Sequence, residues 1–579
     1  MQIRFDDLRP GHRHSFGFVD PIEVLTTDSA AGVAEVVAAA EGRAAAGRWV
    51  AGFLSYEAAP GLDPVLATHP PARGFPVAWF AVFESRLVDP PWPESLPFSL
   101  GEWESQTDRA AHRDALDSIH RSIAAGDTYQ VNHTMRLRGR FTGDAVSAYQ
   151  ALVRAQSGGF GAFLDIDDHL VLSASPELFF AWDENGITTR PMKGTIARGR
   201  WPEEDEAHRR DLIDSHKDRA ENLMIVDLLR NDLGRIAEYG SVEVTDLFGM
   251  ERFDTVWQMT STIRAQPRPG VSLLDVLTGL FPSGSITGAP KARTMEIIRK
   301  LEASPRGLYC GAIGLLAPPG SGEPRAQFNV AIRTVVIDSA SGDAEYGTGG
   351  GITWDSVATS EYDEALVKAA VLTHQPPGFS LLETMLWGPG EGIARWGRHL
   401  SRLQASADYF GFTVPSDLGV VLGEINAEEA QRVRLVLSRE GEVGVQVEPL
   451  EIPDGPVRVA VDSERVDSQD TFLFHKTTHR EVYEAAAGRF PKADDVILVN
   501  ENDMATETTR ANLAVRLGDT WVTPPLDDGC LPGTYRAELV DAGTLREQSV
   551  PRSSLLEADG LAVVSSLRGW LAAELIRPQ

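Results

Sequence analysis

Two spacings of apolar residues recur along the chain and predict a mixture of helices and strands. Apolar residues that return every three or four positions indicate amphipathic helices, whereas short apolar runs between turn residues indicate strands. In the first two thirds of the chain the pattern predicts helices at 113–125, 205–231, 272–279, 291–301 and 361–372. It predicts strands at 160–164, 170–173, 187–189 and 330–337.

The last third carries the same two patterns. Predicted strands span 431–438, 457–461, 496–499 and 513–517, and predicted helices span 397–409 and 478–488. Both parts are therefore expected to be α/β or α+β in class.

One strong break divides the chain. Pro376, Pro377 and Gly378 end the last helical pattern of the first part, because proline cannot continue a helix. We therefore predict a domain at 1–372, a linker at 373–378 and a second domain at 379–579. Each domain is long enough to build its own hydrophobic core.

Charge and cysteine content narrow the possible partners and the compartment. The 579 residues include 83 acidic and 54 basic side chains, for a net charge of −29. This excess argues against a nucleic acid or an anionic membrane as partner, since both are bound by clustered Lys and Arg. Cys310 and Cys530 alone support neither a disulfide framework nor a Cys-ligated zinc site. With no signal sequence and no apolar run of about 20 residues, we expect a cytoplasmic protein.

Two pairs of carboxylates lie at helical spacing. Asp218 and Glu221 are three residues apart, as are Glu361 and Glu364, with Lys368 one turn further on. Such pairs share a helix face. If the two faces met, their oxygens would suit Mg²⁺, which prefers carboxylates, water and an anionic substrate. The alternative is two solvated helix faces, with Glu364 and Lys368 forming a surface ion pair.

Two glycine-rich segments each precede a predicted helix. Residues 281–291 (FPSGSITGAPK) open a predicted helix, where free N–H groups could face an anion, although the spacing is not that of a Walker A motif. Residues 346–351 (YGTGGG) form a predicted turn, where the backbone could approach a ligand closely.

Seven motifs occur in a fixed order over residues 110–372, and together they carry a family resemblance. They are SASPE at 173–177, PMKGT at 191–195, ENLMIVDLLRND at 221–232, the segment 281–291, YCGAIG at 309–314, NVAIRT at 329–334 and the segment 349–364. This set resembles the chorismate-utilising enzymes, which include anthranilate, isochorismate, salicylate and aminodeoxychorismate synthases. The resemblance implies an αββα sandwich.

The resemblance also implies site residues. It places Mg²⁺ between Asp218, Glu221, Glu361 and Glu364, and makes Glu177 the general acid/base at the leaving hydroxyl. It implies that chorismate is bound by these residues: Gln130, Thr195, Tyr309, Arg333, Gly349, Gly350, Gly351 and Lys368.

Lys193 and Gln130 discriminate among members of this family. A desolvated lysine can act as a neutral nucleophile, and a lysine at position 193 is typical of the members that form aminodeoxychorismate, whereas anthranilate synthases have alanine. The alternative for Lys193 is an ion pair with a neighbouring acid. Gln130 stands where isochorismate-forming relatives have a lysine that activates water, and an amide cannot act as that base. Gln258 replaces a histidine found in many relatives.

The first domain lacks the means to release ammonia from glutamine. A glutamine amidotransferase needs a cysteine nucleophile with a histidine partner, and Cys310 lies inside a chorismate motif. Chorismate and ammonia are therefore the expected substrates, and ammonia would come from solution or from a separate glutamine amidotransferase subunit.

The second domain contains the residue types that bind pyridoxal phosphate. The cofactor needs a lysine, a carboxylate for its ring nitrogen, and an arginine with hydroxyls and amides for its phosphate. Taken singly, Lys476, Arg402 and Glu507 could each be a solvated surface charge. The order of motifs over 379–570, however, resembles the fold-type IV pyridoxal enzymes, which include aminotransferases and aminodeoxychorismate lyase.

By this second resemblance, Lys476 is the Schiff-base lysine and a catalytic residue, and Glu507 pairs with the ring nitrogen. The resemblance implies that the cofactor phosphate is bound by Arg402, Gly533, Thr534, Tyr535, Ser565 and Ser566. An N-terminal hairpin found in relatives is missing before Phe379. Such relatives usually dimerise, so a homodimer is expected.

Together the two resemblances imply an enzyme that aminates chorismate to 4-amino-4-deoxychorismate and then removes pyruvate to leave 4-aminobenzoate, as in folate synthesis. Two alternatives stay open. One is an anthranilate-type synthase fused to an aminotransferase, and the other is a chain in which one half is a degenerate binding module.

Overall fold

The computed structural model describes residues 1–579 except 10–13, 157–158, 373–377, 424, 426 and 577–579. Its contacts divide the chain into two compact units. The first unit comprises the described residues of 1–198 and 208–376, and the second those of 199–207 and 377–579. Residues 373–377 of the predicted linker lie outside the described residues.

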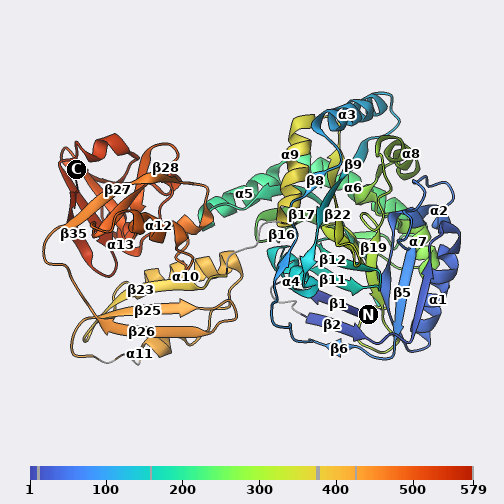
Figure 1. Cartoon of the computed structure of the whole chain (residues 1–579), viewed down its shortest axis with the longest axis horizontal. Helices are drawn as coiled ribbons and strands as arrows, with labels where there is room; N and C mark the ends of the chain where they lie inside the picture. The colour runs from blue at the N-terminus through green and yellow to red at the C-terminus, as the bar shows by residue number, and fades with distance from the viewer. Residues whose placement is uncertain (10–13, 157–158, 373–377, 424, 426, 577–579) are drawn as a thin grey trace. The chain divides into compact units, whose positions relative to one another are not determined.

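Two large sheets form the frame of the first unit (Figure 1). In spatial order the first sheet contains β18 (Gly288–Ala289), β9 (Gln130–Arg140), β22 (Asp343–Ile352), β21 (Thr334–Asp338), β12 (His169–Ser175), β11 (Phe160–Asp165), β1 (Gln2–Asp7), β2 (His14–Val19) and β6 (Leu87–Val88), with β8 (Glu104–Ser105) beside β9. The second contains β15 (Met192–Ala197), β17 (Val256–Ala265), β14 (Gly186–Arg190), β13 (Leu178–Asp183), β20 (Ala326–Val330), β19 (Ala312–Leu316), β4 (Trp49–Leu54), β5 (Ala78–Phe83) and β3 (Glu23–Thr27), with β16 (Glu243–Arg252) beside β17.

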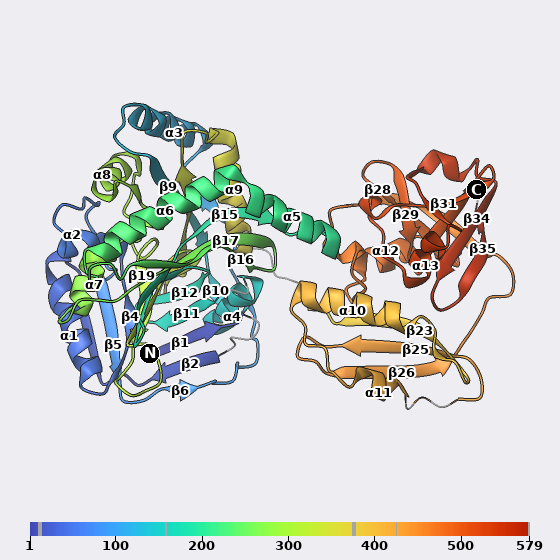
Figure 2. The same ribbon diagram turned by 180° about the vertical axis from the view of Figure 1, so that it is seen from behind.

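Apolar side chains from both sheets meet in a central core that includes Phe18, Phe53 and Ile313. Helices cover the outer faces, as Figure 2 shows. On the second sheet, α1 (Val33–Ala45), α6 (His216–Gly234) and α7 (Leu273–Leu280) share a core with the strands, and α4 (Ala145–Gln156) packs on the first sheet. This layering confirms the predicted αββα sandwich. The other first-unit elements include α2 (Ala59–Leu62), α3 (Arg109–Ala124), α8 (Lys291–Leu301), α9 (Ala358–Ala369) and the pair β7 (Phe98–Ser99) and β10 (Thr142–Gly143).

Two predicted elements are each split in the structure. The helix predicted at 205–231 consists of α5 (Pro202–Asp214) and α6, separated at Ser215, which caps α6 by accepting a hydrogen bond from the Asp218 N–H at 3.2 Å. The strand predicted at 330–337 consists of β20 and β21, because Arg333 adopts a left-handed φ of 52° between them.

The glycine-rich segment 346–351 is part of a strand and not the turn that the sequence predicts. Gly349, Gly350 and Gly351 belong to β22 and lie opposite Thr134, His133 and Asn132 of β9. Extended pairing is available to these glycines because a long neighbouring strand supplies the hydrogen bonds.

The second unit contains a small and a large sheet, each with helices. The small sheet runs β24 (Gly392–Ile393), β23 (Leu381–Gly388), β25 (Gln431–Leu437) and β26 (Val443–Pro449), and α10 (Trp396–Phe410) and α11 (Leu418–Gly423) share its core. The large sheet runs β32 (Arg546–Glu547), β31 (Thr520–Thr523), β30 (Asn512–Leu517), β34 (Gly560–Ser565), β35 (Gly569–Leu575), β27 (Val457–Val466), β28 (Asp495–Asn500), β29 (Met504–Thr508) and β33 (Val550–Pro551). Helices α12 (Glu481–Arg489) and α13 (Thr534–Asp541) accompany it.

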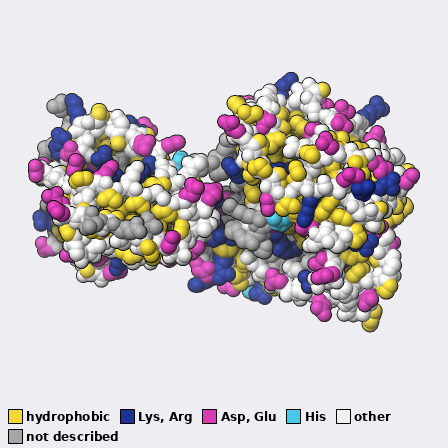
Figure 3. All heavy atoms as spheres, turned by 90° about the horizontal axis from the view of Figure 1, so that it is seen from below, with side chains coloured by type: hydrophobic (Ala, Val, Ile, Leu, Met, Phe, Trp, Pro, Cys, Tyr) yellow, Lys and Arg dark blue, Asp and Glu magenta, His cyan; other side chains and the backbone are white. Residues whose placement is uncertain are grey.

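The surface reflects the acidic composition. Asp and Glu side chains are spread over both units on the face in Figure 3. Among the described residues, no helix has both the length and the apolar character that crossing a membrane requires.

Two candidate active sites

The first candidate site surrounds Lys193, which lies on β15 at one edge of the second sheet. A Cβ atom added to Gly351 would lie 3.1 Å from the Lys193 Nζ and 2.5 Å from the Gln130 Nε2. The Gln130 amide is fully buried, and neither its nitrogen nor its oxygen has a hydrogen-bond partner among the described residues. A buried amide with both polar atoms unpaired is costly unless a ligand or water pairs with it. The three residues thus define a polar ligand site.

Charged groups from several elements surround the Lys193 amine. Burial is the main cause of its lowered pKa, and the neighbouring Lys368 ammonium lowers it further. The carboxylates of Glu221, Glu177 and Glu364 act in the opposite direction. The structure therefore brings the lysine together with three of the predicted acidic residues and one predicted substrate-binding lysine.

Glu177 follows β12 and is buried, with 3% of its surface exposed. Burial raises the pKa of its carboxyl to about 7, although a hydrogen bond from the Ser285 hydroxyl and the charge of Lys193 both lower it. The Ser285 Oγ lies 2.5 Å from the Glu177 Oε1 and 2.9 Å from the Ser283 Oγ. A carboxyl with this pKa can both give and accept a proton near neutral pH.

The two predicted acidic helix faces lie near each other. Burial raises the pKa of Glu221 on α6, and the charges of Asp218 and of Glu361 on α9 add to the increase. A Cβ atom on Gly350 would lie 3.3 Å from the Glu361 Oε2. The charge of Glu361 on α9 is thus close enough to influence Glu221 on α6.

The same carboxylates do not converge as a complete metal site. Among the described residues, no group of three or more His, Cys, Asp and Glu side chains is arranged to hold a metal ion. The Ser215 hydroxyl donates to the Asp218 carboxylate. Glu364 is exposed and forms an ion pair with the Lys368 Nζ at 2.8 Å. The same Lys368 amine also donates a hydrogen bond to the Gly349 carbonyl at 3.1 Å.

Three further predicted residues lie on neighbouring elements. The buried ring of Tyr309 lies against Gly347, where an added Cβ would be 2.1 Å from the Tyr309 Cγ. Arg333 has no carboxylate or hydrogen-bond partner among the described residues, and burial lowers its pKa. Thr195 is exposed and donates to the Gln258 Oε1 at 2.8 Å, while the Gln258 Nε2 donates to the Gly194 carbonyl at 2.8 Å. Gln258 thus braces the strand that carries Lys193.

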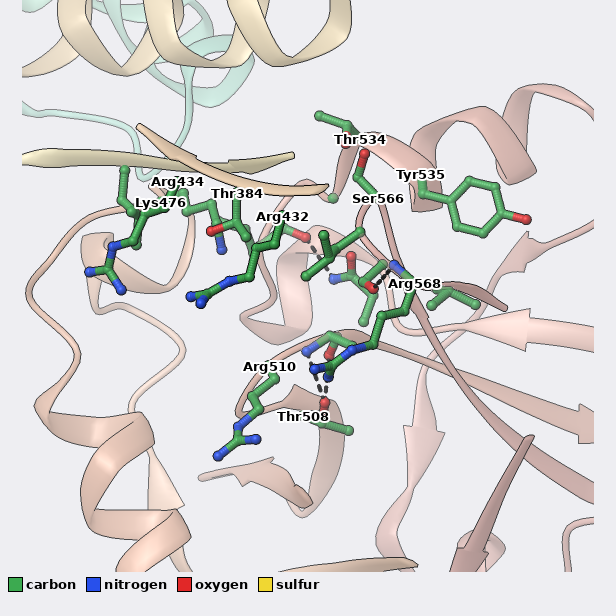
Figure 4. A pocket seen from close by; sticks show the side chains of 18 of the residues that line it. Thr384, Arg432, Arg434, Lys476, Thr508, Arg510, Thr534, Tyr535, Ser566 and Arg568 are labelled. Atoms are coloured by element: carbon green, nitrogen blue, oxygen red, sulfur yellow. Dashed lines mark hydrogen bonds between the residues drawn. The ribbon is translucent and has the colours of Figure 1, made fainter. Parts of the chain in front are cut away.

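The second candidate site is a cavity of about 610 Å³ in the second unit, within the size range of cofactor pockets. All eight residues predicted to bind the cofactor line it, as Figure 4 shows in part. They are Arg402, Lys476, Glu507, Gly533, Thr534, Tyr535, Ser565 and Ser566.

Lys476 and Glu507 form the reactive part of this cavity. Burial lowers the pKa of the Lys476 amine to about 8, assisted by the charges of Arg402 and Arg480. Burial raises the pKa of Glu507 to about 7, although it accepts a hydrogen bond from the Tyr483 hydroxyl at 2.9 Å. A lysine and a buried carboxyl facing one cavity fit the two ends of a pyridoxal ring.

The hydroxyl-rich side of the cavity is held by a buried ion pair. Arg402 donates to Glu383 at 2.8 and 2.6 Å, and Glu383 lies 2.7 Å from His399, whose other ring nitrogen lies 2.7 Å from the Ser566 Oγ. Thr534 begins α13 next to Gly533, so the helix start faces the cavity. These donors fit a phosphate group.

Tyr535 lines the same cavity, but Figure 4 shows its side chain turned away from the arginines labelled there. Its ring instead packs against Arg395, whose guanidinium lies 4.2 Å from the ring centre.

Besides the predicted Arg402, the cavity is lined by five arginines to which the sequence assigned no role, namely Arg432, Arg434, Arg480, Arg510 and Arg568. They come from distant parts of the chain, so no single motif contains them. One local signal was available, because Arg432 and Arg434 alternate on β25 and therefore share one face of a strand.

Comparison with known proteins identifies the class of each unit. Residues 5–374 match the chorismate binding enzyme family, and residues 380–576 match the amino-transferase class IV family. The first match covers more than half of the sequence, and the chain belongs to the chorismate binding enzyme family.

Individual relatives agree with this assignment. The chain is 43% identical to an aminodeoxychorismate synthase of Streptomyces griseus over 326 residues, which are 55% of this chain and 43% of the relative. It is 41% identical to aminodeoxychorismate synthase component 1 of Salmonella typhimurium over 283 residues, which are 49% of this chain and 61% of the relative. The chain thus spans about half the length of the curated relatives it matches.

A solved structure supports the fold of the first unit. The structure of anthranilate synthase component I from Streptococcus pneumoniae is similar with a TM-score of 0.56 and 26% identity, and the match covers 63% of this chain and 93% of that protein.

Proposed function

We propose that the chain makes 4-aminobenzoate from chorismate, with the first unit replacing the C4 hydroxyl by an amine and the second unit removing pyruvate. The names of the relatives and the class IV match of the second unit support this proposal. The observation that carries it is the position of the Lys193 amine beside the unpaired Gln130 amide and Gly351, close to the charge of Glu177. In this position a neutral lysine amine can act as a nucleophile.

In the first reaction, the neutral Lys193 amine adds to C2 of chorismate, the ring double bonds shift, and the C4–O bond breaks. Glu177, protonated in part near its pKa of about 7, gives a proton to the departing oxygen, which leaves as water. Ammonia then adds at C4, the double bonds shift back and the bond between C2 and Lys193 breaks. The net change is chorismate plus ammonia to 4-amino-4-deoxychorismate plus water.

The remaining predicted residues would bind and orient chorismate. Asp218, Glu221, Glu361 and Glu364 would supply carboxylate oxygens to Mg²⁺. Because no three of them are arranged to hold a metal ion among the described residues, this role requires their side chains to move toward one another. The substrate carboxylates would be bound by Arg333, Lys368 and the amides of Gly349, Gly350 and Gly351, with Gln130, Thr195 and Tyr309 completing the site. Arg333 has no acidic partner among the described residues, so its charge is available to a carboxylate.

In the second reaction, pyridoxal phosphate would be held by Lys476, Glu507 and the donors around Arg402, and it would supply an electron sink for the charge left at C4. Lys476 takes the C4 proton. The C3–O bond then breaks, the enol oxygen keeps the bonding electrons, and proton transfer to carbon gives pyruvate. Formation of the aromatic ring of 4-aminobenzoate makes this step favourable.

We further propose that a separate glutamine amidotransferase subunit supplies the ammonia, since the Salmonella typhimurium relative is a component 1, a name that implies a second component. A homodimer formed through the second unit is also part of this proposal.

The proposal is tested by incubating the full chain with chorismate, Mg²⁺ and ammonium, with and without pyridoxal phosphate. We expect 4-aminobenzoate and pyruvate with the cofactor and accumulation of 4-amino-4-deoxychorismate without it. Lys193→Ala should lower amination by two or more orders of magnitude, while Lys300→Ala, an exposed position on α8, should leave it unchanged. Formation of 2-aminobenzoate by the wild type would contradict the proposal and favour an anthranilate-type synthase.

A further inference from the structure

The cavity of the second unit is strongly cationic in a chain that is acidic as a whole. Seven of its lining side chains are Lys or Arg and three are Glu, whereas the chain carries a net charge of −29. Charges of one sign that line a cavity focus the field and attract ligands of the opposite sign. The excess of positive charge therefore points to a ligand with more than one anionic group.

Some of these cations are already paired within the protein. Arg402 is bound to Glu383 at 2.6 Å, and Arg432 is bound to Glu448 at 2.5 Å. Arg480 donates to the Thr509 carbonyl at 2.5 Å, and Arg568 donates to the Glu451 carbonyl at 3.0 Å. These contacts fix the four guanidinium groups in place.

Arg434 and Arg510 differ from the others. Within the part of the chain that the structure describes, the guanidinium group of neither residue has a carboxylate or hydrogen-bond partner, although both residues line the cavity. A guanidinium group pairs well with a carboxylate because its donors match the two oxygens. Two unpaired arginines at one cavity therefore suit two carboxylates.

The two arginines reach the cavity from different directions. Arg434 lies on β25 of the small sheet, and Arg510 lies in the turn between β29 and β30, three residues after Glu507. Figure 4 shows both around the same cavity as Lys476. The hydroxyls of Thr534 and Ser566, near Arg402, form a separate group of donors that suits the cofactor phosphate. The unpaired arginines are therefore left for the substrate.

We propose that Arg434 and Arg510 bind the carboxylates of a substrate amine that carries two of them, and so select it against amino acids with one carboxylate. This inference rests on the proposed function, because 4-amino-4-deoxychorismate has one carboxylate on its ring and one on its enolpyruvyl group. It adds the substrate class and the residues that recognise it. The two arginines bind and position the substrate, and the reacting groups remain Lys476 and the cofactor.

The test compares full-length, cofactor-loaded wild type with Arg434→Gln and Arg510→Gln, using purified 4-amino-4-deoxychorismate as substrate. Arg546→Gln is the matched control, since Arg546 is exposed on β32 of the same unit and does not line the cavity. Loss of one charged hydrogen-bonding pair should raise KM about tenfold or more, with kcat within about threefold. The control should match the wild type, and Arg434→Lys should lie in between because the charge remains and the fork is lost. The cofactor absorbance band should be unchanged in all variants.

Three outcomes are informative. If the wild type forms 4-aminobenzoate and both variants keep its KM within twofold, the inference is wrong and the proposed function stands. If the wild type reacts with the amino group of alanine as efficiently as with that of 4-amino-4-deoxychorismate, the proposed selection of dicarboxylates and the proposed lyase reaction are both wrong. If KM rises in both variants and alanine is a poor substrate for the wild type, the inference is supported.

Discussion

Glu177 is held near neutral pKa by two opposing effects. Burial raises its pKa, and the hydrogen bond from Ser285 lowers it by stabilising the charged form. If Glu177 assists loss of the C4 hydroxyl as proposed, its carboxyl must be protonated, and the amination rate should fall as the pH rises through this pKa. Ser285 is therefore expected to set the upper pH limit of the first reaction.

Ser285→Ala should move that limit upward by about one pH unit, because the charged form of Glu177 loses a stabilising hydrogen bond. The measurement is the pH profile of kcat/KM for amination by the full chain. Ser283→Ala is the control, since Ser283 contacts Ser285 and not Glu177. An unchanged profile in Ser285→Ala would show that the hydrogen bond does not control this titration.

In the proposed first reaction, the absence of a side chain at Gly351 leaves room for the substrate beside Lys193. An alanine methyl group there would lie 2.5 Å from the Gln130 Nε2 and 3.1 Å from the Lys193 Nζ. Gly351→Ala should lower kcat/KM for chorismate about a hundredfold, because a displacement of about 1 Å at a reacting group has an effect of that size. Gly42→Ala is the control, since nothing lies within 4 Å of that Cβ. Wild-type activity of Gly351→Ala, with normal thermal unfolding, would place the substrate elsewhere.

At the scale of single residues, the sequence identified candidate functional residues where they belong to a recognisable motif. Lys193, Glu177 and Gln130 were identified from the residues around them, and the structure places Lys193 near both of the others. Arg434 and Arg510 were given no role, because nothing in the sequence shows that these two distant arginines meet at one cavity. Only folding of β25 and of the turn after β29 places them at one cavity.

At the scale of elements, the local sequence pattern predicted where helices and strands lie better than it predicted whether each one is unbroken. The helix predicted at 291–301 is observed as α8 (Lys291–Leu301). The break at Ser215 was not predicted, although residues 214–219 are all polar and the serine side chain competes for backbone N–H groups and starts a new helix. The glycines of β22 were expected in a turn, since their pairing with β9 depends on residues about 200 positions away in the chain.

The Ser215 cap orients the start of α6, where Asp218 lies in the first turn and Glu221 in the second. Ser215→Ala should lower the free energy of unfolding by about 1 kcal/mol, the usual effect of losing an N-cap. If Asp218 and Glu221 bind Mg²⁺ as proposed, the same change should weaken Mg²⁺ binding as measured by calorimetry. Ser215→Thr keeps a capping hydroxyl and should restore most of both properties. If Ser215→Ala lowers the free energy of unfolding but leaves the Mg²⁺ affinity unchanged, the cap stabilises the helix without affecting Mg²⁺ binding.

At the scale of the whole molecule, the order of motifs predicted the family of the first unit and the class IV amino-transferase match of the second. The layered fold of the first unit followed from its motifs and is confirmed by the two packed sheets. Residues 199–207 group with the second unit although they come early in the chain. No periodic pattern predicts such a grouping, because it depends on tertiary contacts alone.

A buried ionic network connects the first unit across distant elements and determines its behaviour in acid. Glu302, at the end of α8, accepts hydrogen bonds from Arg306 at 2.7 and 3.0 Å and from the Thr134 N–H of β9 at 3.0 Å. Burial alone would raise the pKa of Glu302, but Arg306 and Arg136 lower it to about 2. The folded-state pKa thus lies below the unfolded value of roughly 4.3. The stability from this carboxylate is therefore present above pH 4.3 and is lost as the pH falls toward 2.

Glu302→Gln should lower the free energy of unfolding of the full chain by about 3–5 kcal/mol at pH 7, because it leaves the buried Arg306 without its partner charge. The measurement is urea unfolding of wild type and variant at pH 7 and pH 3. The difference between them should shrink at pH 3, where the wild type has lost part of the same contribution. Glu23→Gln removes an acid from an exposed pair with Arg43 and should change stability little at either pH. An equal loss for Glu302→Gln at both pH values would mean that Glu302 acts through packing and hydrogen bonds, since only the charge depends on pH in this range.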